Sequence, residues 1–340
     1  MIRLQSIEAP RGGAEGANLS VLVTGAAGFV GAHLCRALLA RGESVVGVDN
    51  FNAYYDPSLK RARTALLTPS PQFRLVAMDI AEHEAMGALV QEVAPSTVVH
   101  LAAQAGVRYS LDNPFAYQRS NLEGHLSVLE ACRHGPSVRH LVYASSSSVY
   151  GDRPMGGAGF REDEPAIEPV SLYAATKRSG ELMSSAYSRL YGMAQTGLRF
   201  FTVYGPYGRP DMAYFGFTKA ILAGEPIEVF GEGRMARDFT YVDDIIDGIL
   251  GVVDHPAGEG QARVFNIGDS RPVALMDMIS TLERALGREA IKVMRPMQPG
   301  DVTATYADIS RLNALCGYQP KVSLEQGLPR FVEWYRGYCG

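Results

Sequence analysis

The sequence has few cysteines and no long apolar segment, and both absences narrow the class of protein. Its four cysteines are scattered without a C-x-x-C pair, so no disulfide framework is predicted and reduced thiols in the cytoplasm are favoured. The seven histidines lack the spacing of metal ligands, and we expect no metal site. No run of about eighteen apolar residues occurs, which excludes a predicted membrane span.

The chain also carries little excess charge. A formal net charge of −4 gives no general attraction for nucleic acid, so an anionic ligand would have to be met by local charges. A length of 340 residues allows one large domain and a smaller one. Residues 1–18 lack the apolar segment of a signal peptide, and we expect them to be a disordered or vector-derived lead outside the fold.

The most informative local motif, at residues 21–31, reads V-L-V-T-G-A-A-G-F-V-G. Its apolar start predicts a buried strand, its glycines a tight turn, and the intervals of four between Val30, Leu34 and Leu38 a helix. The free N–H groups and the positive dipole end of a helix N-terminus suit a pyrophosphate. Glycines can mark a tight turn alone, but strand, turn and helix together favour a dinucleotide site. Its predicted residues are Gly25, Gly28, Phe29, Val30 and Gly31.

A second apolar strand ends at Asp49, eighteen residues after Gly31. A carboxylate at this position accepts hydrogen bonds from the adenosine ribose and repels a 2′-phosphate. The next residue is Asn50 rather than an arginine. The expected cofactor is therefore NAD rather than NADP.

Strands and helices then alternate as in a doubly wound parallel sheet, the Rossmann class of α/β fold. We expect strands at 73–76, 97–100, 141–144 and 196–201, and helices at 81–92, 115–133 and 172–191. The alternation breaks down after Tyr204, which predicts a second, smaller mixed α/β domain for the substrate. The expected division is 19–204 plus about 240–268 for the NAD-binding domain, with strand 264–267 returning to the main sheet. The substrate domain takes 205–239 plus about 269–335, with helices at 275–286 and 324–335.

Further cofactor contacts are expected where the third and fourth strands end. Asp79 and Ile80 would lie beside the adenine, although Asp79 could equally cap the following helix. His100 is predicted to be a packed strand-end residue rather than a catalyst. Small residues just beyond it would let the cofactor pass over the backbone. This segment consists of Leu101, Ala102, Ala103 and Gln104.

Tyr173 and Lys177 lie four residues apart, on one face of the helix expected at 172–191. The pair follows a strand that ends in four serines, at the sheet edge where open α/β folds bind ligands. A phenol normally loses its proton near pH 10, and a nearby ammonium together with a positive nicotinamide would lower that pKa. A serine opposite Tyr173 would orient the substrate alcohol. These groups predict removal of a carbinol proton while NAD⁺ takes the hydride.

Three strings resemble the extended short-chain dehydrogenase/reductase superfamily, in its sugar-nucleotide epimerase and dehydratase branch: T-G-A-A-G-F-V-G, Y-A-S-S-S-S-V-Y-G and Y-A-A-T-K. The similarity covers about residues 19–335. It implies that Ser146 is the catalytic serine beside Tyr173 and Lys177. Decarboxylating and dehydrating relatives carry a glutamate two residues before Tyr150, where this chain has Ser148. That departure disfavours those two reactions.

Longer strings are similar to the UDP-glucuronate 4-epimerases, notably D-N-F-N-A-Y-Y-D-P-S-L-K, V-Y-G-P-Y-G-R-P-D-M-A and M-Q-P-G-D-V. This resemblance implies reversible C4 epimerisation of UDP-glucuronate through a 4-keto intermediate, with tightly bound NAD. It also implies that Ser147, Ser148 and Thr202 meet the sugar and its carboxylate. Arg209, Arg237, Gln298 and Asp301 would meet the diphosphate and nucleoside. Arg108 and Val229 complete the expected substrate site.

Other activities remain open from the residues alone. The same catalytic groups would serve another UDP-sugar 4-epimerase, a net dehydrogenase, or a dehydratase or decarboxylase. A non-catalytic NAD-binding protein is disfavoured because Ser146, Tyr173 and Lys177 are all present. The resemblance also implies a homodimer that pairs the helices at 115–133 and 172–191. Neither nucleic acid nor a membrane is an expected partner.

Overall fold

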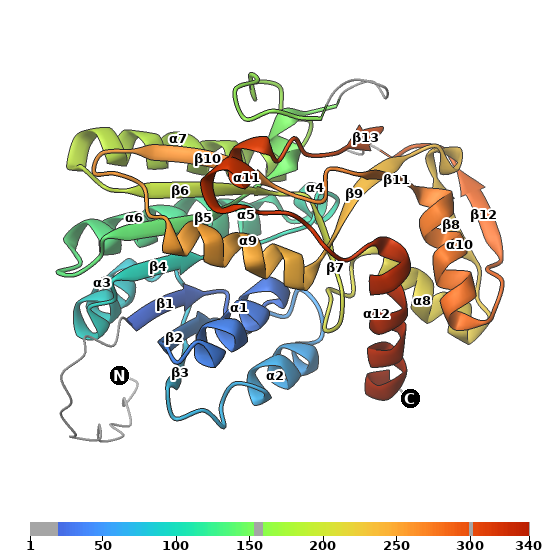
Figure 1. Cartoon of the computed structure of the whole chain (residues 1–340), viewed down its shortest axis with the longest axis horizontal. Coiled ribbons are helices and arrows are strands. Elements are labelled where there is room, and N and C mark those ends of the chain that lie inside the picture. The colour runs from blue at the N-terminus through green and yellow to red at the C-terminus, as the bar shows by residue number, and fades with distance from the viewer. Residues whose placement is uncertain (1–19, 153–158, 299–301, 340) are drawn as a thin grey trace.

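The computed structural model describes residues 20–152, 159–298 and 302–339, so the lead expected at 1–18 lies outside the described residues. A seven-stranded parallel sheet forms the centre of the larger part (Figure 1), in the order β3-β2-β1-β4-β5-β6-β10. This is the predicted doubly wound topology, and β10 joins the sheet beside β6 as expected. The strands are β1 (Ser20–Thr24), β2 (Ser44–Asp49), β3 (Phe73–Ala77), β4 (Thr97–His100), β5 (His140–Ser146), β6 (Gln195–Phe200) and β10 (Ala262–Ile267).

Helices cover both faces of this sheet because successive strand residues point to opposite sides. In β1, Val21 and Val23 pack in one apolar core while Leu22 packs in the other. One face carries α1 (Phe29–Ala40), α2 (Pro57–Ala65), α9 (Val242–Asp254) and α11 (Ser310–Cys316). The other carries α3 (His83–Val93), α6 (Gly124–His134) and α7 (Leu172–Tyr191).

The helix expected at 115–133 is interrupted by a π-helical turn. Two short helices, α4 (Tyr109–Asp112) and α5 (Pro114–Tyr117), precede a π-helical turn at Gln118–Glu123, and α6 follows. The extra residue of a π turn breaks the helical period. Here the turn directs Asn121 inward, where its Nδ2 donates to Gln104 O and Thr176 Oγ1 at 3.0 Å each.

A smaller lobe lies on the right of Figure 1. In the described residues it contains a four-stranded sheet of β7 (Thr202–Tyr204), β9 (Ala236–Tyr241), β11 (Pro272–Ala274) and β13 (Ala304–Thr305). A second sheet pairs β8 (Ile227–Phe230) with β12 (Lys292–Arg295). The helices of the smaller lobe are α8 (Ala213–Ala223), α10 (Leu275–Leu286) and α12 (Leu324–Cys339).

The division of the chain differs from the expected one at α11. Leu312 and Tyr318 pack in the core under the large sheet, although 269–335 was assigned to the smaller domain. Helix α11 contacts α9 and β10, which brings the chain back to the Rossmann part before α12 returns to the smaller lobe. Among the described residues, the helices are too short or too polar to cross a bilayer.

Candidate active site

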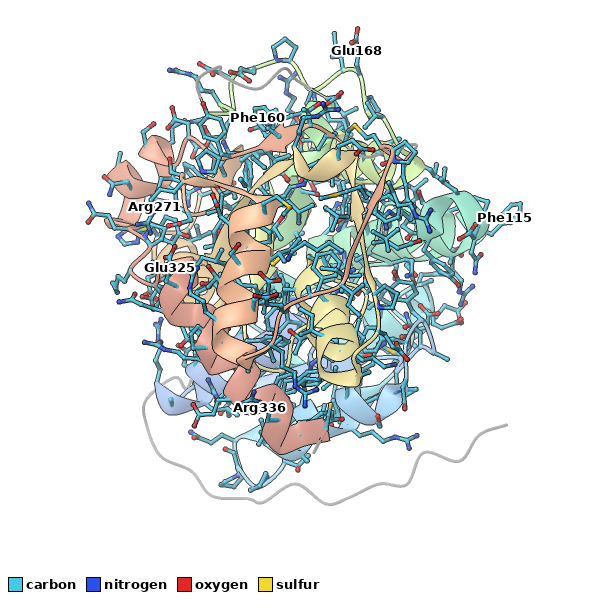
Figure 2. All side chains as sticks on the ribbon, turned by 90° about the vertical axis from the view of Figure 1, so that its right-hand side faces the viewer. Phe115, Phe160, Glu168, Arg271, Glu325 and Arg336 are labelled. Atoms are coloured by element: carbon cyan, nitrogen blue, oxygen red, sulfur yellow. The ribbon has the colours of Figure 1, made fainter. Side chains whose placement is uncertain are left out.

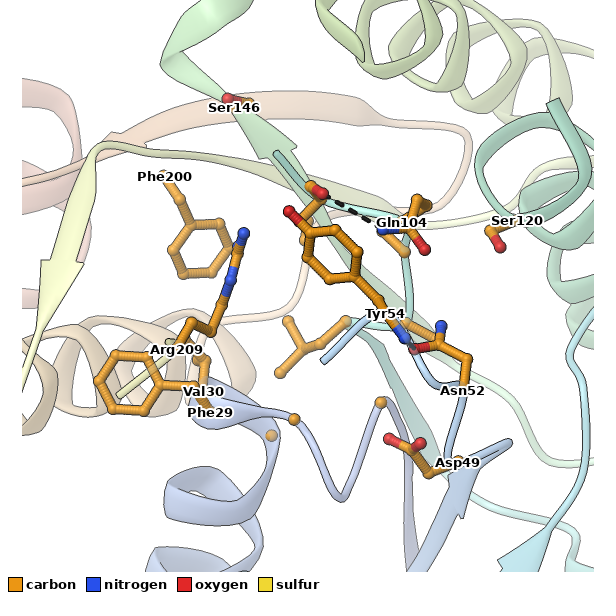
Figure 3. A pocket seen from close by; sticks show the side chains of 18 of the residues that line it. Phe29, Val30, Asp49, Asn52, Tyr54, Gln104, Ser120, Ser146, Phe200 and Arg209 are labelled. Carbon is orange, nitrogen blue, oxygen red and sulfur yellow. Dashed lines mark hydrogen bonds between the residues drawn. The ribbon is translucent and has the colours of Figure 1, made fainter. Parts of the chain in front are cut away.

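A cavity opens at the carboxyl ends of the large sheet's strands (Figure 3). This is the edge at which open α/β sheets bind ligands. Every residue predicted to bind the cofactor lines this cavity, and so does Ser146. The lining residues include Gly25, Gly28, Phe29, Val30, Gly31, Asp49, Asn50, Asp79, Ile80, Leu101, Ala102, Ala103, Gln104, Tyr173 and Lys177.

The glycine turn between β1 and α1 leaves no room for side chains. Gly25 has a φ of +74°, and a Cβ there would lie 2.8 Å from Ala102 N. A Cβ on Gly31 would lie 2.0 Å from Gly25 O. No side chain caps the N-terminus of α1 at Gly28, so its first N–H groups stay available to an anion. This cradle fits the pyrophosphate of a dinucleotide.

Asp49 is fixed at the end of β2, facing the cavity (Figure 3). Its Oδ2 accepts the N–H of Ala27 at 3.1 Å, and its Oδ1 accepts the N–H of Phe51 at 2.8 Å. Asp79 lines the cavity too, but it does not cap α3, because the helix begins at His83 with Glu82 at its N-cap. The capping alternative for Asp79 is therefore wrong.

The expected catalytic groups converge on the cavity from α7 and β5. Ser171 caps α7 by accepting the N–H of Ala174 at 3.1 Å, which places Tyr173 in the first turn. Lys177 Nζ donates to Ala144 O at 2.8 Å. Ser146 Oγ lies 2.9 Å from Ser148 Oγ, so the two hydroxyls orient one another.

The pKa values of Tyr173 and Lys177 are both shifted from their ordinary values. Burial raises the pKa of the Tyr173 phenol, while the Ser146 hydroxyl and the charge on Arg209 lower it in part. Burial and the charge on Arg209 lower the pKa of Lys177 to about 8. The lowering of the Tyr173 pKa by Lys177 and a positive nicotinamide concerns the NAD-bound site and stays a prediction.

Glu181 continues the line of Tyr173 and Lys177 along the inner face of α7, at the same spacing of four residues. It is 3% exposed and accepts two hydrogen bonds from Arg199, at 2.8 and 2.9 Å. It also accepts the Ser145 hydroxyl at 2.6 Å, next to the catalytic serine. The repeated spacing of four residues could have indicated Glu181 from the sequence.

The cavity wall also contains residues that the sequence patterns do not predict. Tyr54 extends into it from the loop between β2 and α2 (Figure 3). Lys60 Nζ donates to Asn52 Oδ1 at 2.8 Å. His100 is packed behind the wall as predicted, 4% exposed, with its Nδ1 2.7 Å from Thr24 Oγ1. Additional lining residues are Tyr55, Met78, Ala105, Ser120, Ala144, Ser145, Phe200, Phe201, Val203 and Met212.

The expected substrate residues, unlike the expected cofactor residues, mostly lie outside the lining of this cavity. Among those in the described part of the chain, only Arg209 lines this cavity, where it pairs with Asp211 at 2.5 Å. Arg108 stacks on the ring of Phe230 at 4.8 Å, in the smaller lobe. Arg237 Nη1 donates to Ala236 O at 2.9 Å. Ser147, Ser148, Thr202 and Gln298 lie outside the cavity lining, and Asp301 lies outside the described residues.

Val229 departs from its expected role as a substrate contact. Its side chain is 0% exposed and packs in the apolar core of the smaller lobe. Alternate residues of β8 point inward, so any ligand contact at this position would be made by backbone atoms.

Comparison with known proteins agrees with the fold and the cofactor cradle. The model of the NAD dependent epimerase/dehydratase family matches residues 21–268. The chain belongs to this family. Membership agrees with the prediction of NAD as cofactor and with a glycine turn that fits its pyrophosphate.

Relatives in the NAD dependent epimerase/dehydratase family share most of the chain. UDP-glucuronate 4-epimerase 3 of Arabidopsis thaliana is 48% identical over 94% of this chain and 77% of its own. A probable UDP-glucuronate 4-epimerase of Rhizobium meliloti is 46% identical over 92% of this chain and 96% of its own. The UDP-glucuronic acid 4-epimerase of Bacillus cereus, crystallised with UDP-glucuronic acid and NAD, is 37% identical. The two structures superpose with a TM-score of 0.88. The superposition covers 94% of this chain and 100% of the Bacillus cereus chain.

Proposed function

We propose that the protein is an NAD-dependent UDP-glucuronate 4-epimerase, which interconverts UDP-glucuronate and UDP-galacturonate through a 4-keto intermediate. The observation that carries this function is the identity of almost one half to UDP-glucuronate 4-epimerases over nearly the whole chain. The convergence of Tyr173, Lys177 and Ser146 on one cavity supports it. When bound, NAD supplies a hydride acceptor and donor, and its positive nicotinamide favours the phenolate of Tyr173.

Tyr173 acts as the general base and acid of this reaction. Its phenolate takes the proton from the C4 hydroxyl during oxidation, and its phenol returns a proton to the C4 oxygen during reduction. The Ser146 hydroxyl, oriented by Ser148 at 2.9 Å, holds that oxygen in place. Lys177, held by Ala144 O, contributes its charge and holds the nicotinamide ribose.

Arg209 contacts the substrate diphosphate in this proposal, together with Arg237. An arginine guanidinium suits a diphosphate because it donates two parallel hydrogen bonds to neighbouring oxygens. Arg209 supports this assignment by its position in the cavity wall, beside the predicted cofactor residues. Its charge also acts on Tyr173 and Lys177, so a bound diphosphate would change the electrostatics of both.

The assay of this function uses purified protein with UDP-glucuronate. It follows formation of UDP-galacturonate by chromatography and the absorbance of reduced nicotinamide in the same sample. An epimerase yields UDP-galacturonate without a stoichiometric rise in reduced nicotinamide, because the hydride returns to the sugar. Stoichiometric reduction of added NAD⁺ would instead indicate a net dehydrogenase.

Ser148 is expected to keep the carboxylate on the sugar. Oxidation at C4 creates a β-keto acid, which loses carbon dioxide unless the carboxylate is held near the carbonyl plane. Hydroxyl groups at Ser147 and Thr202 can donate hydrogen bonds that hold it there, and so can Ser148 once its proton turns from Ser146 Oγ to the substrate. A glutamate at position 148 would add like charge and favour loss of the carboxylate as neutral gas.

The corresponding prediction is that Ser148→Glu raises carbon dioxide release per turnover by about tenfold or more, equivalent to about 1.4 kcal/mol. Released carbon dioxide and the UDP-pentose product would be measured together with reduced nicotinamide. Ser148→Thr keeps the hydroxyl and should behave as the unmodified enzyme. If Ser148→Glu and Ser148→Ala release no more carbon dioxide than the unmodified enzyme, the restraint lies at other residues.

We also propose a homodimer that acts in the cytoplasm. The four cysteines are free thiols, which supports a reducing compartment. Apolar side chains are exposed along α5, α6 and α7, and Phe115 projects from the molecule's outer edge (Figure 2). Such exposed apolar faces are typical of interfaces. The side chains are Phe115, Leu126, Leu172, Leu182, Leu190 and Tyr191.

Light scattering at micromolar concentration is expected to give twice the chain mass of 36.8 kDa. Leu182→Arg, on α7, should yield monomers because it places a charge in the proposed interface. Ile291→Arg is the matched control, since Ile291 is equally exposed but lies in the smaller lobe. A monomeric unmodified protein would contradict the proposed dimer.

A further inference from the structure

Arg63 is a buried cation with neutral partners only. It lies on α2 and is 1% exposed. Its Nε and Nη2 donate to Tyr207 O at 3.0 and 2.7 Å, and Nη2 also donates to Gly208 O at 3.2 Å. Its Nη1 donates to Ala27 O at 3.1 Å and to Tyr55 Oη at 2.6 Å. Within the described part of the chain, none of its contacts is a carboxylate.

These hydrogen bonds join segments that are far apart in the sequence. Ala27 belongs to the glycine turn that would hold the cofactor pyrophosphate, and Tyr55 lines the cavity. Tyr207 and Gly208 directly precede Arg209, the arginine in the cavity wall. One guanidinium therefore sets the distance between the cofactor turn and the Arg209 segment.

The Arg209 segment needs such a support because its backbone is strained. Tyr207 has a φ of +58°, in the left-handed region that non-glycine residues rarely adopt. A conformation of this kind persists only when the surroundings hold it. Two hydrogen bonds from Arg63 hold the Tyr207 carbonyl, and the ring of Trp334 packs on the Tyr207 ring at 4.9 Å.

Burying a cation without a carboxylate partner costs free energy, because the charge loses its hydration. Carbonyl and phenol oxygens satisfy the hydrogen bonds of Arg63 but leave its net charge in place. That charge lies behind a turn suited to one pyrophosphate and beside a segment proposed to meet a second. Anionic diphosphates in the cavity would offset it.

We propose that Arg63 is a positioning residue for diphosphate recognition, which fixes the Tyr207–Arg209 segment on the cofactor turn so that Arg209 meets the substrate diphosphate. The inference rests on the proposed function, in which Arg209 contacts that diphosphate. Arg63 does not line the cavity and acts through Arg209 and the glycine turn.

The test compares equilibrium binding of UDP and of uridine to the NAD-loaded enzyme by calorimetry. Arg63→Met is expected to raise the Kd of UDP by about tenfold or more and that of uridine by less than about threefold, because uridine lacks the diphosphate. Arg61→Met is the matched control, since Arg61 is exposed on the same helix. It should leave both constants unchanged.

A double-mutant cycle separates positioning from general destabilisation. In an Arg209→Gln background, Arg63→Met should raise the Kd of UDP by less than about threefold, since the group it positions is gone. If Arg63→Met does not fold, Arg63→Lys takes its place, because an ammonium keeps the charge but cannot reach all of these acceptors.

The outcomes distinguish this inference from the proposed function. Equal weakening of UDP and uridine, or full additivity with Arg209→Gln, would overturn the role of Arg63. An unmodified enzyme that binds UDP with the expected Arg63 dependence but does not epimerise UDP-glucuronate would overturn the proposed function alone. Failure of the unmodified enzyme to bind UDP would overturn both.

Discussion

Tyr173→Phe is expected to reduce kcat by about 10²–10⁴-fold, because general acid–base groups typically contribute that much. The phenyl ring keeps the shape of the partly buried side chain, so the fold and ligand binding should persist. Only the hydroxyl that exchanges a proton with the C4 oxygen is lost. The measurement is kcat for UDP-glucuronate and UDP-galacturonate, with bound NAD determined in the same preparation.

Tyr187→Phe provides the control on the same helix. The Tyr187 hydroxyl donates to Glu130 at 2.5 Å and lies outside the cavity lining. Its removal should change kcat by less than about threefold. If Tyr173→Phe keeps kcat within about threefold of the unmodified enzyme, another group must exchange the proton.

The cofactor side of the site could be predicted from sequence because it is built from contiguous motifs. A parallel sheet brings every strand's carboxyl end to one edge, so the residues after β1, β2, β3 and β4 share a cavity once the strand order is known. The bounds of α7 could also be read directly, since Ser171 caps it and Gly192 ends it. Strand alternation, glycine turns and helix caps each depend on a few neighbouring residues, and they were enough to predict this part of the site.

The rest of the site depends on contacts that no local pattern encodes. The partners of Arg63 come from three separate segments, and its burial is invisible in a helix that reads as polar and exposed. The π-helical turn that directs Asn121 inward departs from the helical period by one residue. Short strands such as β8 have too few residues for alternation to indicate that Val229 points into the core.

Glu181→Ala is expected to lower the free energy of unfolding by about 3–5 kcal/mol, the usual cost of leaving one member of a buried ion pair without its partner. Glu181 and Arg199 are 3% exposed each. Alanine would leave the Arg199 guanidinium beneath the active site without its carboxylate, and Ser145 without its acceptor. Urea unfolding followed by circular dichroism measures the change.

Two variants show whether the effect belongs to the buried pair. Glu92→Ala removes an ion pair with Arg74 in which both side chains are more than half exposed, and should cost about 1 kcal/mol or less. Glu181→Gln keeps the shape and part of the hydrogen bonding, so its cost should fall between the two. A loss for Glu181→Ala no larger than that for Glu92→Ala would contradict the assignment.

The pH dependence of stability gives a second signature of Glu181. Burial raises its pKa. The hydrogen bonds and charge of Arg199, with further hydrogen bonds from Ser145 and Arg178, outweigh burial and hold the pKa below its ordinary value. A carboxyl with a depressed pKa stabilises the fold above its unfolded value of about 4.3 and loses that contribution as the pH falls through the folded value. The difference in unfolding free energy between the unmodified enzyme and Glu181→Gln should therefore be full at neutral pH and shrink below about pH 4. A difference that stayed constant across this range would assign the stabilisation to shape and hydrogen bonding rather than to the charge of Glu181.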